Sequence, residues 1–130
     1  MRCGLRLLIA AVTVAACSCA HGRRAADSRQ VLAHLDPITV NVVNNYQSAM
    51  EIYAVVGKTT YRVGTVAPGI PRSFELRLAT LASGGHMALL AQASGAGPRY
   101  QSDDLYLSPG NVVDFEIETN LIGSHANVRP

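Results

Sequence analysis

The pattern that decides the fold begins at residues 38–44, which are Ile-Thr-Val-Asn-Val-Val-Asn. In an extended chain Ile38, Val40 and Val42 share one face, and the polar residues between them lie on the other. Similar runs recur at intervals of about 8 to 12 residues, with turn residues between them, as far as Thr119. This spacing is typical of an all-β sandwich rather than of a helical protein.

The turn residues and the period of two together predict seven strands. They cover residues 38–44, 50–56, 59–66, 72–78, 86–93, 99–107 and 111–119. Phe74 and Phe115 are predicted core anchors, because each lies in phase with Leu, Val or Ile residues of its own strand. Seven strands predict an immunoglobulin-like, Greek-key β-sandwich over residues 37–120. We expect residues 121–130 to form a loose C-terminal tail.

The N-terminal residues 1–16 have the organisation of an export signal. Arg2 and Arg6 precede an uncharged run from Leu7 to Ala16, as in the charged and apolar regions of a secretory signal peptide. This run is shorter than the ~20 apolar residues that a membrane span needs. Because a few apolar residues follow it, a retained transmembrane helix is the alternative interpretation. Without the two arginines the formal charge of +2 falls to zero, so the charge gives no support for nucleic-acid binding.

The residues at the end of this signal, Val14-Ala15-Ala16-Cys17, resemble the lipobox of bacterial lipoproteins at every position. The resemblance implies cleavage before Cys17, a diacylglyceryl group on its thiol, and an acyl chain such as palmitate on the new amino terminus. Two or more acyl chains anchor a protein stably, whereas one holds it only marginally. Ser18 stands where Asp favours the inner membrane, which implies the outer membrane in a bacterium that has one. Ordinary signal cleavage after Ala20 is the alternative.

Residues 17–36 are predicted to be a flexible tether that carries the lipid at Cys17, because they contain few large apolar groups. A random coil of this length spans about 20 to 25 Å. A short helix over residues 29–35 is the alternative. Cys3 leaves with the signal and Cys19 has no partner within the mature chain, so we expect no disulfide in the folded domain.

The sequence carries no recognisable catalytic or cofactor motif. It lacks Gly-x-Ser-x-Gly, His-Glu-x-x-His and the glycine-rich phosphate loops. Its four histidines are scattered over the tether, a strand and the tail: His21, His34, His86 and His125. Asp114, Glu116 and Glu118 form an acidic stripe, but a strand spreads carboxylates apart whereas calcium sites gather them around one point. We therefore predict no catalytic site, no cofactor and no metal.

The tyrosines offer a recognition surface, because tyrosine supplies amphipathic contact area at low entropic cost. Besides Tyr46, the candidate interaction surface comprises Tyr53, Tyr61, Tyr100 and Tyr106. Ordinary cross-strand packing of these rings is the alternative. The run over residues 86–93 is mostly apolar, which predicts a strand buried on both faces or one that meets a partner.

Two further patterns, Gly-x-Val-x-Pro at residues 64–68 and Ser-Pro-Gly-x-x-Val-x-Phe at residues 108–115, are similar to those of small bacterial lipoproteins with a single β-sandwich. The resemblance implies no catalytic residues. We predict a lipid-anchored cell-envelope protein whose domain is a non-enzymatic binding or accessory module for a protein or a glycan. The alternatives are a small envelope enzyme with a loop-borne site, and a structural lipoprotein that self-associates through an edge strand.

Overall fold

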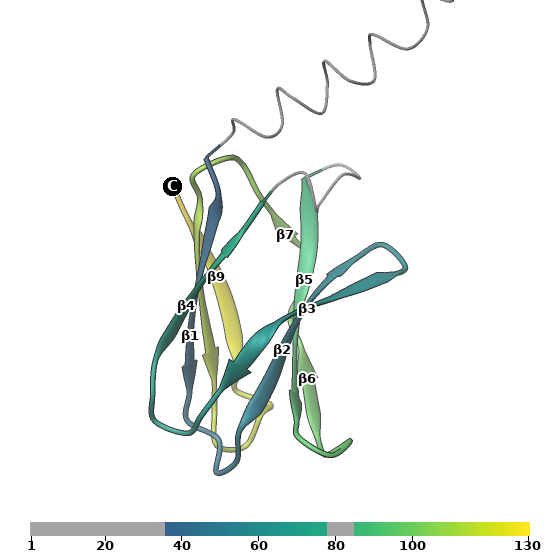
Figure 1. Ribbon diagram of the computed structural model, residues 1–130, viewed down its shortest axis with the longest axis vertical. Helices are drawn as coiled ribbons and strands as arrows, with labels where there is room; N and C mark the ends of the chain where they lie inside the picture. The colour runs from purple at the N-terminus through teal and green to yellow at the C-terminus, as the bar shows by residue number, and fades with distance from the viewer. Residues whose placement is uncertain (1–35, 78–84) are drawn as a thin grey trace, which may run out of the picture.

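The computed structural model describes residues 36–77 and 85–130, and these fold as a sandwich of two β-sheets (Figure 1). The described residues form nine strands: β1 (Ile38–Asn44), β2 (Met50–Val56), β3 (Thr59–Val66), β4 (Arg72–Leu76), β5 (His86–Ala93), β6 (Arg99–Gln101), β7 (Leu105–Tyr106), β8 (Val112–Ile117) and β9 (His125–Arg129). The prediction of an all-β sandwich is confirmed. The signal peptide, Cys17 and the tether lie outside the described residues.

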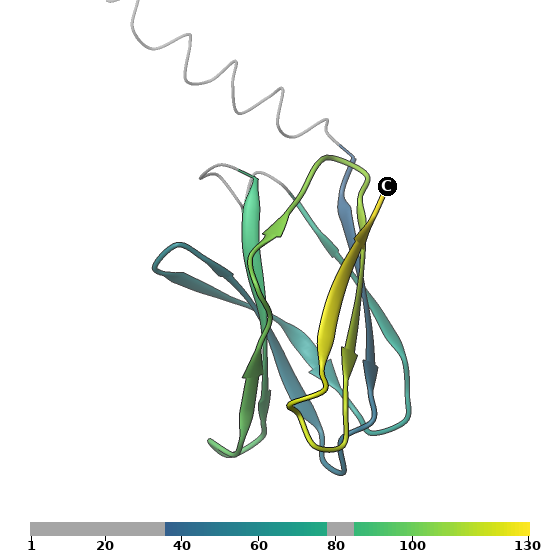
Figure 2. The same cartoon turned by 180° about the vertical axis from the view of Figure 1, so that it is seen from behind.

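The chain passes repeatedly between the two sheets. One sheet has the order β4-β1-β8-β9 and the other the order β3-β2-β5-β6, with β7 also paired to β5. Neighbouring strands are antiparallel except β1 and β8, which run parallel with Val42 beside Phe115. Seen from behind, the C-terminal strand β9 lies along β8 at the edge of its sheet (Figure 2). Among the described residues no helix is long and apolar enough to cross a membrane.

The core lies between the sheets and follows the predicted alternation. In β1 and β2 every second side chain is buried, and in β8 Val113, Phe115 and Ile117 are at most 1% exposed. Such apolar burial contributes about 25 cal/mol for each Å² removed from water. On β5, Met87 and Ala88 point to opposite faces and are both buried, as the apolar run over this strand predicted.

The prediction of one strand over residues 99–107 is wrong, because the chain leaves the sheet at Ser102. This residue is buried, and its hydroxyl accepts the N–H of Leu89 at 2.9 Å and donates to the carbonyl of Asp103 at 2.8 Å. A serine side chain thus takes the place that a main-chain carbonyl would hold in a continuous ladder. Pairing breaks here and resumes three residues later, at Leu105, which produces β6 and β7.

The prediction of a loose tail over residues 121–130 is also wrong, because β9 pairs antiparallel with β8 along its whole length. The hydroxyl of Ser124 accepts the N–H of Glu118 at 2.9 Å, which closes the loop before β9. Ala126 then packs against the core. These two corrections raise the seven predicted strands to the nine that the described residues form, and they extend the folded domain beyond residue 120.

Phe74 occupies the edge of the core rather than its centre. The side chain is half-buried and packs against the core cluster, and its ring lies so close to Gly64 that a Cβ there would collide with it. The Arg72 guanidinium lies 6.0 Å from the ring centroid. The predicted anchor is therefore a packing residue between β3 and β4, and Leu78, predicted to point inward beside it, lies outside the described residues.

Candidate functional site

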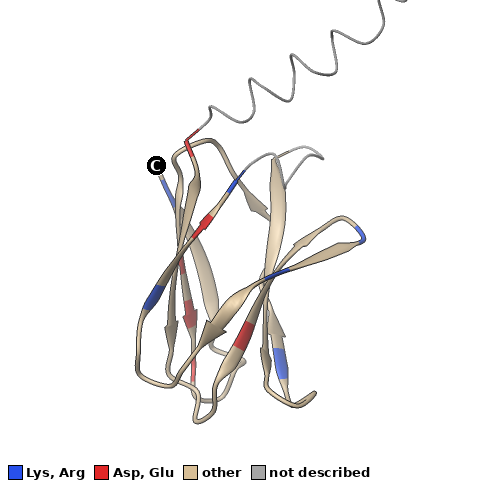
Figure 3. Cartoon of the chain, in the orientation of Figure 1, with Lys and Arg blue, Asp and Glu red and all other residues tan. Residues whose placement is uncertain are grey.

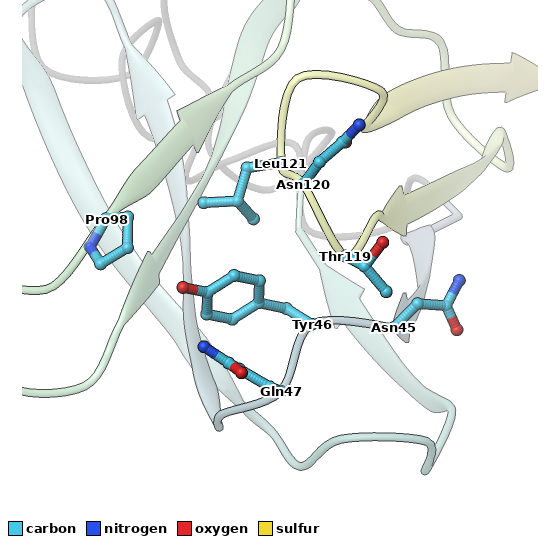
Figure 4. Close-up of a pocket in the computed structure, with 7 residues that line it drawn as sticks. All are labelled: Asn45, Tyr46, Gln47, Pro98, Thr119, Asn120 and Leu121. Atoms are coloured by element: carbon cyan, nitrogen blue, oxygen red, sulfur yellow. The ribbon is translucent and has the colours of Figure 1, made fainter.

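The candidate functional site is a pocket at one end of the sandwich, which we call the loop-end pocket. It is formed by the turn between β1 and β2, the turn between β5 and β6, and the loop between β8 and β9 (Figure 4). Its volume is about 450 Å³, and its lining residues are Asn45, Tyr46, Gln47, Pro98, Thr119, Asn120 and Leu121. Main-chain hydrogen bonds join the loops: Asn45 donates to the carbonyl of Ile117 at 2.8 Å, and Ser94 donates to that of Ala49 at 3.3 Å.

The loop-end pocket lies opposite the point where the chain enters the domain. β1 and β8 run parallel and both finish at the pocket, and β5 finishes beside the start of β2, since Ala93 pairs with Met50. At the other end the N–H of Gly110 donates to the carbonyl of Asp36, just before β1, at 3.3 Å. In Figure 1 the chain enters β1 at the top and the three loops lie at the bottom.

The turn between β1 and β2 is held by a buried amide. The Asn44 side chain is 0% exposed; its Nδ2 donates to the carbonyls of Ser48 and Val66 at 2.9 and 3.0 Å, and its Oδ1 accepts the N–H of Tyr46 at 3.0 Å. One side chain therefore fixes the backbone that carries Tyr46. In Figure 4 the Tyr46 hydroxyl points toward the side of the pocket where Pro98 lies.

The loop between β8 and β9 contains a strained residue. Leu121 has a φ of 59°, a left-handed conformation that costs a residue with a Cβ about 1 to 2 kcal/mol. Its side chain is 8% exposed and belongs to the core. Its N–H donates to Glu118 and its carbonyl accepts from Ser124, both at 3.1 Å. Apolar burial and these hydrogen bonds offset the strain, so the loop has a defined shape.

The lining of the pocket is neutral but polar. None of its seven residues is charged, and between them they present three side-chain amides and two hydroxyls. The turns at residues 45–49 and 94–98 contain no charged residue, and both are tan in Figure 3. Two acids lie next to the lining: Glu116 accepts a hydrogen bond from the Asn45 amide at 3.2 Å, and Glu118 directly precedes Thr119 in the chain. This arrangement suits binding of an uncharged polar molecule.

The acidic stripe predicted on β8 makes contacts with protein groups on the outer face of its sheet. Asp114 accepts hydrogen bonds from Arg129 and from Asn41, and these, in that order, lower the pKa of its carboxyl below the ordinary value. Glu116 lies 3.8 Å from the His125 ring nitrogen. Across residues 36–77 and 85–130, no three His, Cys, Asp or Glu side chains gather where they could hold a metal ion.

The four tyrosines of the predicted interaction surface lie in separate places. Tyr100 is half-buried and stacks on Phe115 with ring centroids 6.2 Å apart, and burial raises the pKa of its hydroxyl. Tyr53 donates to Glu51 on the outer face of β2 at 2.9 Å. Tyr106 is 79% exposed near His86. They do not form one surface, and the loop-end pocket instead contains Tyr46.

Tyr61 lines a second hollow of about 450 Å³ between the edge strands β3 and β4. This hollow has apolar walls that include Val63, Phe74 and Leu76, with Arg62, Glu75 and Arg77 also lining it.

The histidines considered in the sequence do not gather at this hollow or at the loop-end pocket. His125 lies against Glu116 and the carbonyl of Gly123, His86 lies near Tyr106, and His21 and His34 lie outside the described residues.

Sequence reasoning missed most of the loop-end pocket. Its amide residues are Asn45, Gln47 and Asn120. Asparagine is a common turn residue, and none of the three belongs to a recognisable motif. They come together only because three turns far apart in the sequence share one end of the sandwich. The one available signal was Tyr46, an aromatic residue inside a predicted polar turn.

Neither a family model nor a curated protein matches this sequence. Among solved structures, the chain is similar to the NMR structure of a protein from Eubacterium rectale, with 13% sequence identity and a TM-score of 0.40. The alignment covers 72% of this chain and 88% of that one.

Proposed function

We propose that the chain is a lipid-anchored protein of the bacterial cell envelope whose sandwich is a non-enzymatic module that binds a glycan or a protein. The observation that carries the proposal is the position of the loop-end pocket, at the end of the domain far from the segment that leads back to Cys17. A binding site on an anchored protein has to be presented away from the membrane. The seven residues of β1 alone separate the two ends by about 23 Å.

The lipobox supports the anchor. With a lipidated Cys17, the tether over residues 17–36 adds about 20 to 25 Å between the bilayer and the domain. The pocket would then face the space beyond the lipid headgroups. Ser18 favours the outer membrane if the organism has one.

We infer that the sandwich is of the immunoglobulin-like, Greek-key kind. The order β3-β2-β5-β6 corresponds to strands C′-C-F-G of that fold, and the pair β4-β1 to strands E-B. β8, parallel to β1, and β9 extend the second sheet beyond the usual pattern. In immunoglobulin-like domains the loops at one end of the sandwich are the common binding sites, which agrees with a binding role for the loop-end pocket.

Cys17→Ala tests the anchor. We expect the wild-type chain to enter the detergent phase on phase separation, and the variant to lose both the lipid and most of this partitioning, because the thiol that would carry the diacylglyceryl group is gone. Mass spectrometry of the N-terminal peptide reads out the lipid directly. Cys19→Ala is the matched control and should behave as the wild type. A Cys17→Ala protein that stays with the membranes without its leader would contradict the proposal.

A photo-crosslinker tests the binding role. Benzophenone-phenylalanine, which inserts into C–H bonds of proteins and sugars alike, replaces Gln47 at the pocket or Ser108 at the opposite end in intact cells. We expect adducts from position 47 and few from position 108, because Gln47 is exposed and lines the pocket. Adducts of the chain with itself would favour the self-associating alternative, and equal yields at both positions would argue against a role for this end.

A further inference from the structure

The geometry of the loop-end pocket points to a specific class of ligand: we propose that it binds the terminal part of a neutral saccharide. This inference rests on the proposed binding function and narrows it. Three observations carry it, namely the uncharged lining, the density of amide groups, and a half-buried aromatic residue beside a buried leucine.

The lining disfavours anionic ligands. A phosphate or a carboxylate loses hydration on entering a pocket and needs an opposite charge there, and none of the seven lining residues provides a positive charge. Glu116 reaches the edge of the site through its 3.2 Å hydrogen bond with Asn45, which further disfavours an anion. A hydrocarbon ligand would in turn leave the amides without partners.

The polar groups match the hydroxyls of a sugar. Each sugar hydroxyl donates and accepts, and each side-chain amide does both from one planar group. Asn45 donates to Glu116 and Asn120 accepts the N–H of Gly123 at 3.1 Å, so both have a fixed orientation that leaves further donor or acceptor positions. The Gln47 side chain is exposed and lines the pocket, so its amide is placed to engage a ligand.

The apolar part of the site suits the other face of a sugar ring. A pyranose presents C–H groups on its faces, and aromatic side chains are suited to pack against them while a phenolic hydroxyl makes a hydrogen bond. Tyr46 and Leu121 supply an aromatic and an aliphatic wall. A volume of about 450 Å³ lies within the ~300–1,000 Å³ range of small-molecule sites, which leaves room for a terminal sugar and part of its neighbour.

The site is already ordered, which lowers the entropic cost of binding. Asn44 holds the backbone of Tyr46 from within the core. The strained backbone of Leu121 is fixed by its own hydrogen bonds and by burial of its side chain. Both walls of the pocket therefore stand on buried residues rather than on flexible loop tips.

The experiment is a calorimetric titration of the mature chain, residues 17–130, in a detergent without a sugar headgroup. The probes are maltotriose, cellotriose and tri-N-acetylchitotriose, with trigalacturonate as an anionic counterpart. We expect saturable binding of at least one neutral trisaccharide and at least tenfold weaker binding of trigalacturonate. Tyr46→Phe and Gln47→Ala should each weaken binding of the neutral trisaccharide about fivefold or more, because each removes a group that would form a hydrogen bond with it.

Tyr106→Phe is the matched control, since it deletes a phenolic hydroxyl from an exposed tyrosine that is not part of the pocket. It should bind as the wild type, and circular dichroism verifies that all variants are folded. Failure of all three neutral probes, tighter binding of trigalacturonate, or an equal loss in Tyr106→Phe would overturn the inference. If the sugars fail but the crosslinker at position 47 still captures a protein, the binding function stands and only its saccharide ligand is wrong.

Discussion

Phe115→Ala is expected to lower the free energy of unfolding by about 3 to 5 kcal/mol. The side chain is 1% exposed and lies in β8, between β1 and β9. Its ring also stacks on Tyr100 from the opposite sheet, with an angle of 29° between the planes, so truncation removes contacts that join the two layers. A domain of this size loses about 4 to 8 °C of melting temperature for each kcal/mol. Thermal and urea unfolding followed by circular dichroism should therefore show a drop of more than about 12 °C.

Phe74→Ala provides the matched comparison, because it deletes the same atoms from a half-buried ring at the edge of the core. We expect a loss of about 1 to 2 kcal/mol, as for partial burial of an aromatic side chain. The order of the two effects is the informative result. A Phe115→Ala protein that unfolds like the wild type, or that is more stable than Phe74→Ala, would show that the inward face of β8 is assigned incorrectly.

Four of the strands could be predicted from the sequence to the residue, and β8 to within two residues at each end. β1, β2, β3 and β5 have the predicted bounds, because residues that turn the chain flank each of them. In β1 and β2 every second side chain is also buried, whereas β3 and β5 do not alternate in this way. Phe115 could be assigned inward because β8 alternates as β1 and β2 do. Local pattern is sufficient wherever one face of a strand meets the core and the other does not.

The sequence was insufficient where a side chain changes the backbone pairing. Ser102 interrupts a ladder with its hydroxyl, and nothing in a local alternation indicates that a serine will replace a carbonyl. β9 was missed because its buried contribution is slight: Ala126 alone of its residues packs on the core. That strand is held instead by backbone pairing with β8 and by ion pairs such as Arg129 with Asp114, which depend on tertiary structure.

The loop-end pocket could not be predicted from local sequence patterns, for a related reason. Its residues come from three turns, at residues 45–47, 98 and 119–121, and they meet because β1 and β8 run parallel and finish together. A parallel pair between distant strands has no signature in either strand. Asn44 was predicted as the last residue of a strand, whereas in the structure its side chain joins the pocket to the core.

Asn44→Ala tests this connection between stability and site. The substitution leaves the N–H of Tyr46 and the carbonyl of Val66 without the partners they have at 3.0 Å, and each unsatisfied buried group costs about 1 to 3 kcal/mol. We expect a total loss of about 2 to 4 kcal/mol in urea unfolding. Asn45→Ala is the matched control, because the neighbouring amide is exposed and its removal should cost less than about 0.5 kcal/mol.

Hydrogen exchange separates a general loss of stability from a specific loss of the turn. In the Asn44→Ala protein the amide of Tyr46 should exchange much faster, because its acceptor is gone, while the amide of Leu89, bound to Ser102 in the core, should change only as far as global stability falls. The affinity for the saccharide should also fall, because the turn that carries Tyr46 is less ordered in the variant. This loss should be seen even at temperatures where the variant is folded. An unchanged exchange rate at Tyr46 would mean that the turn is held by its other contacts, and that Asn44 stabilises the core without shaping the pocket.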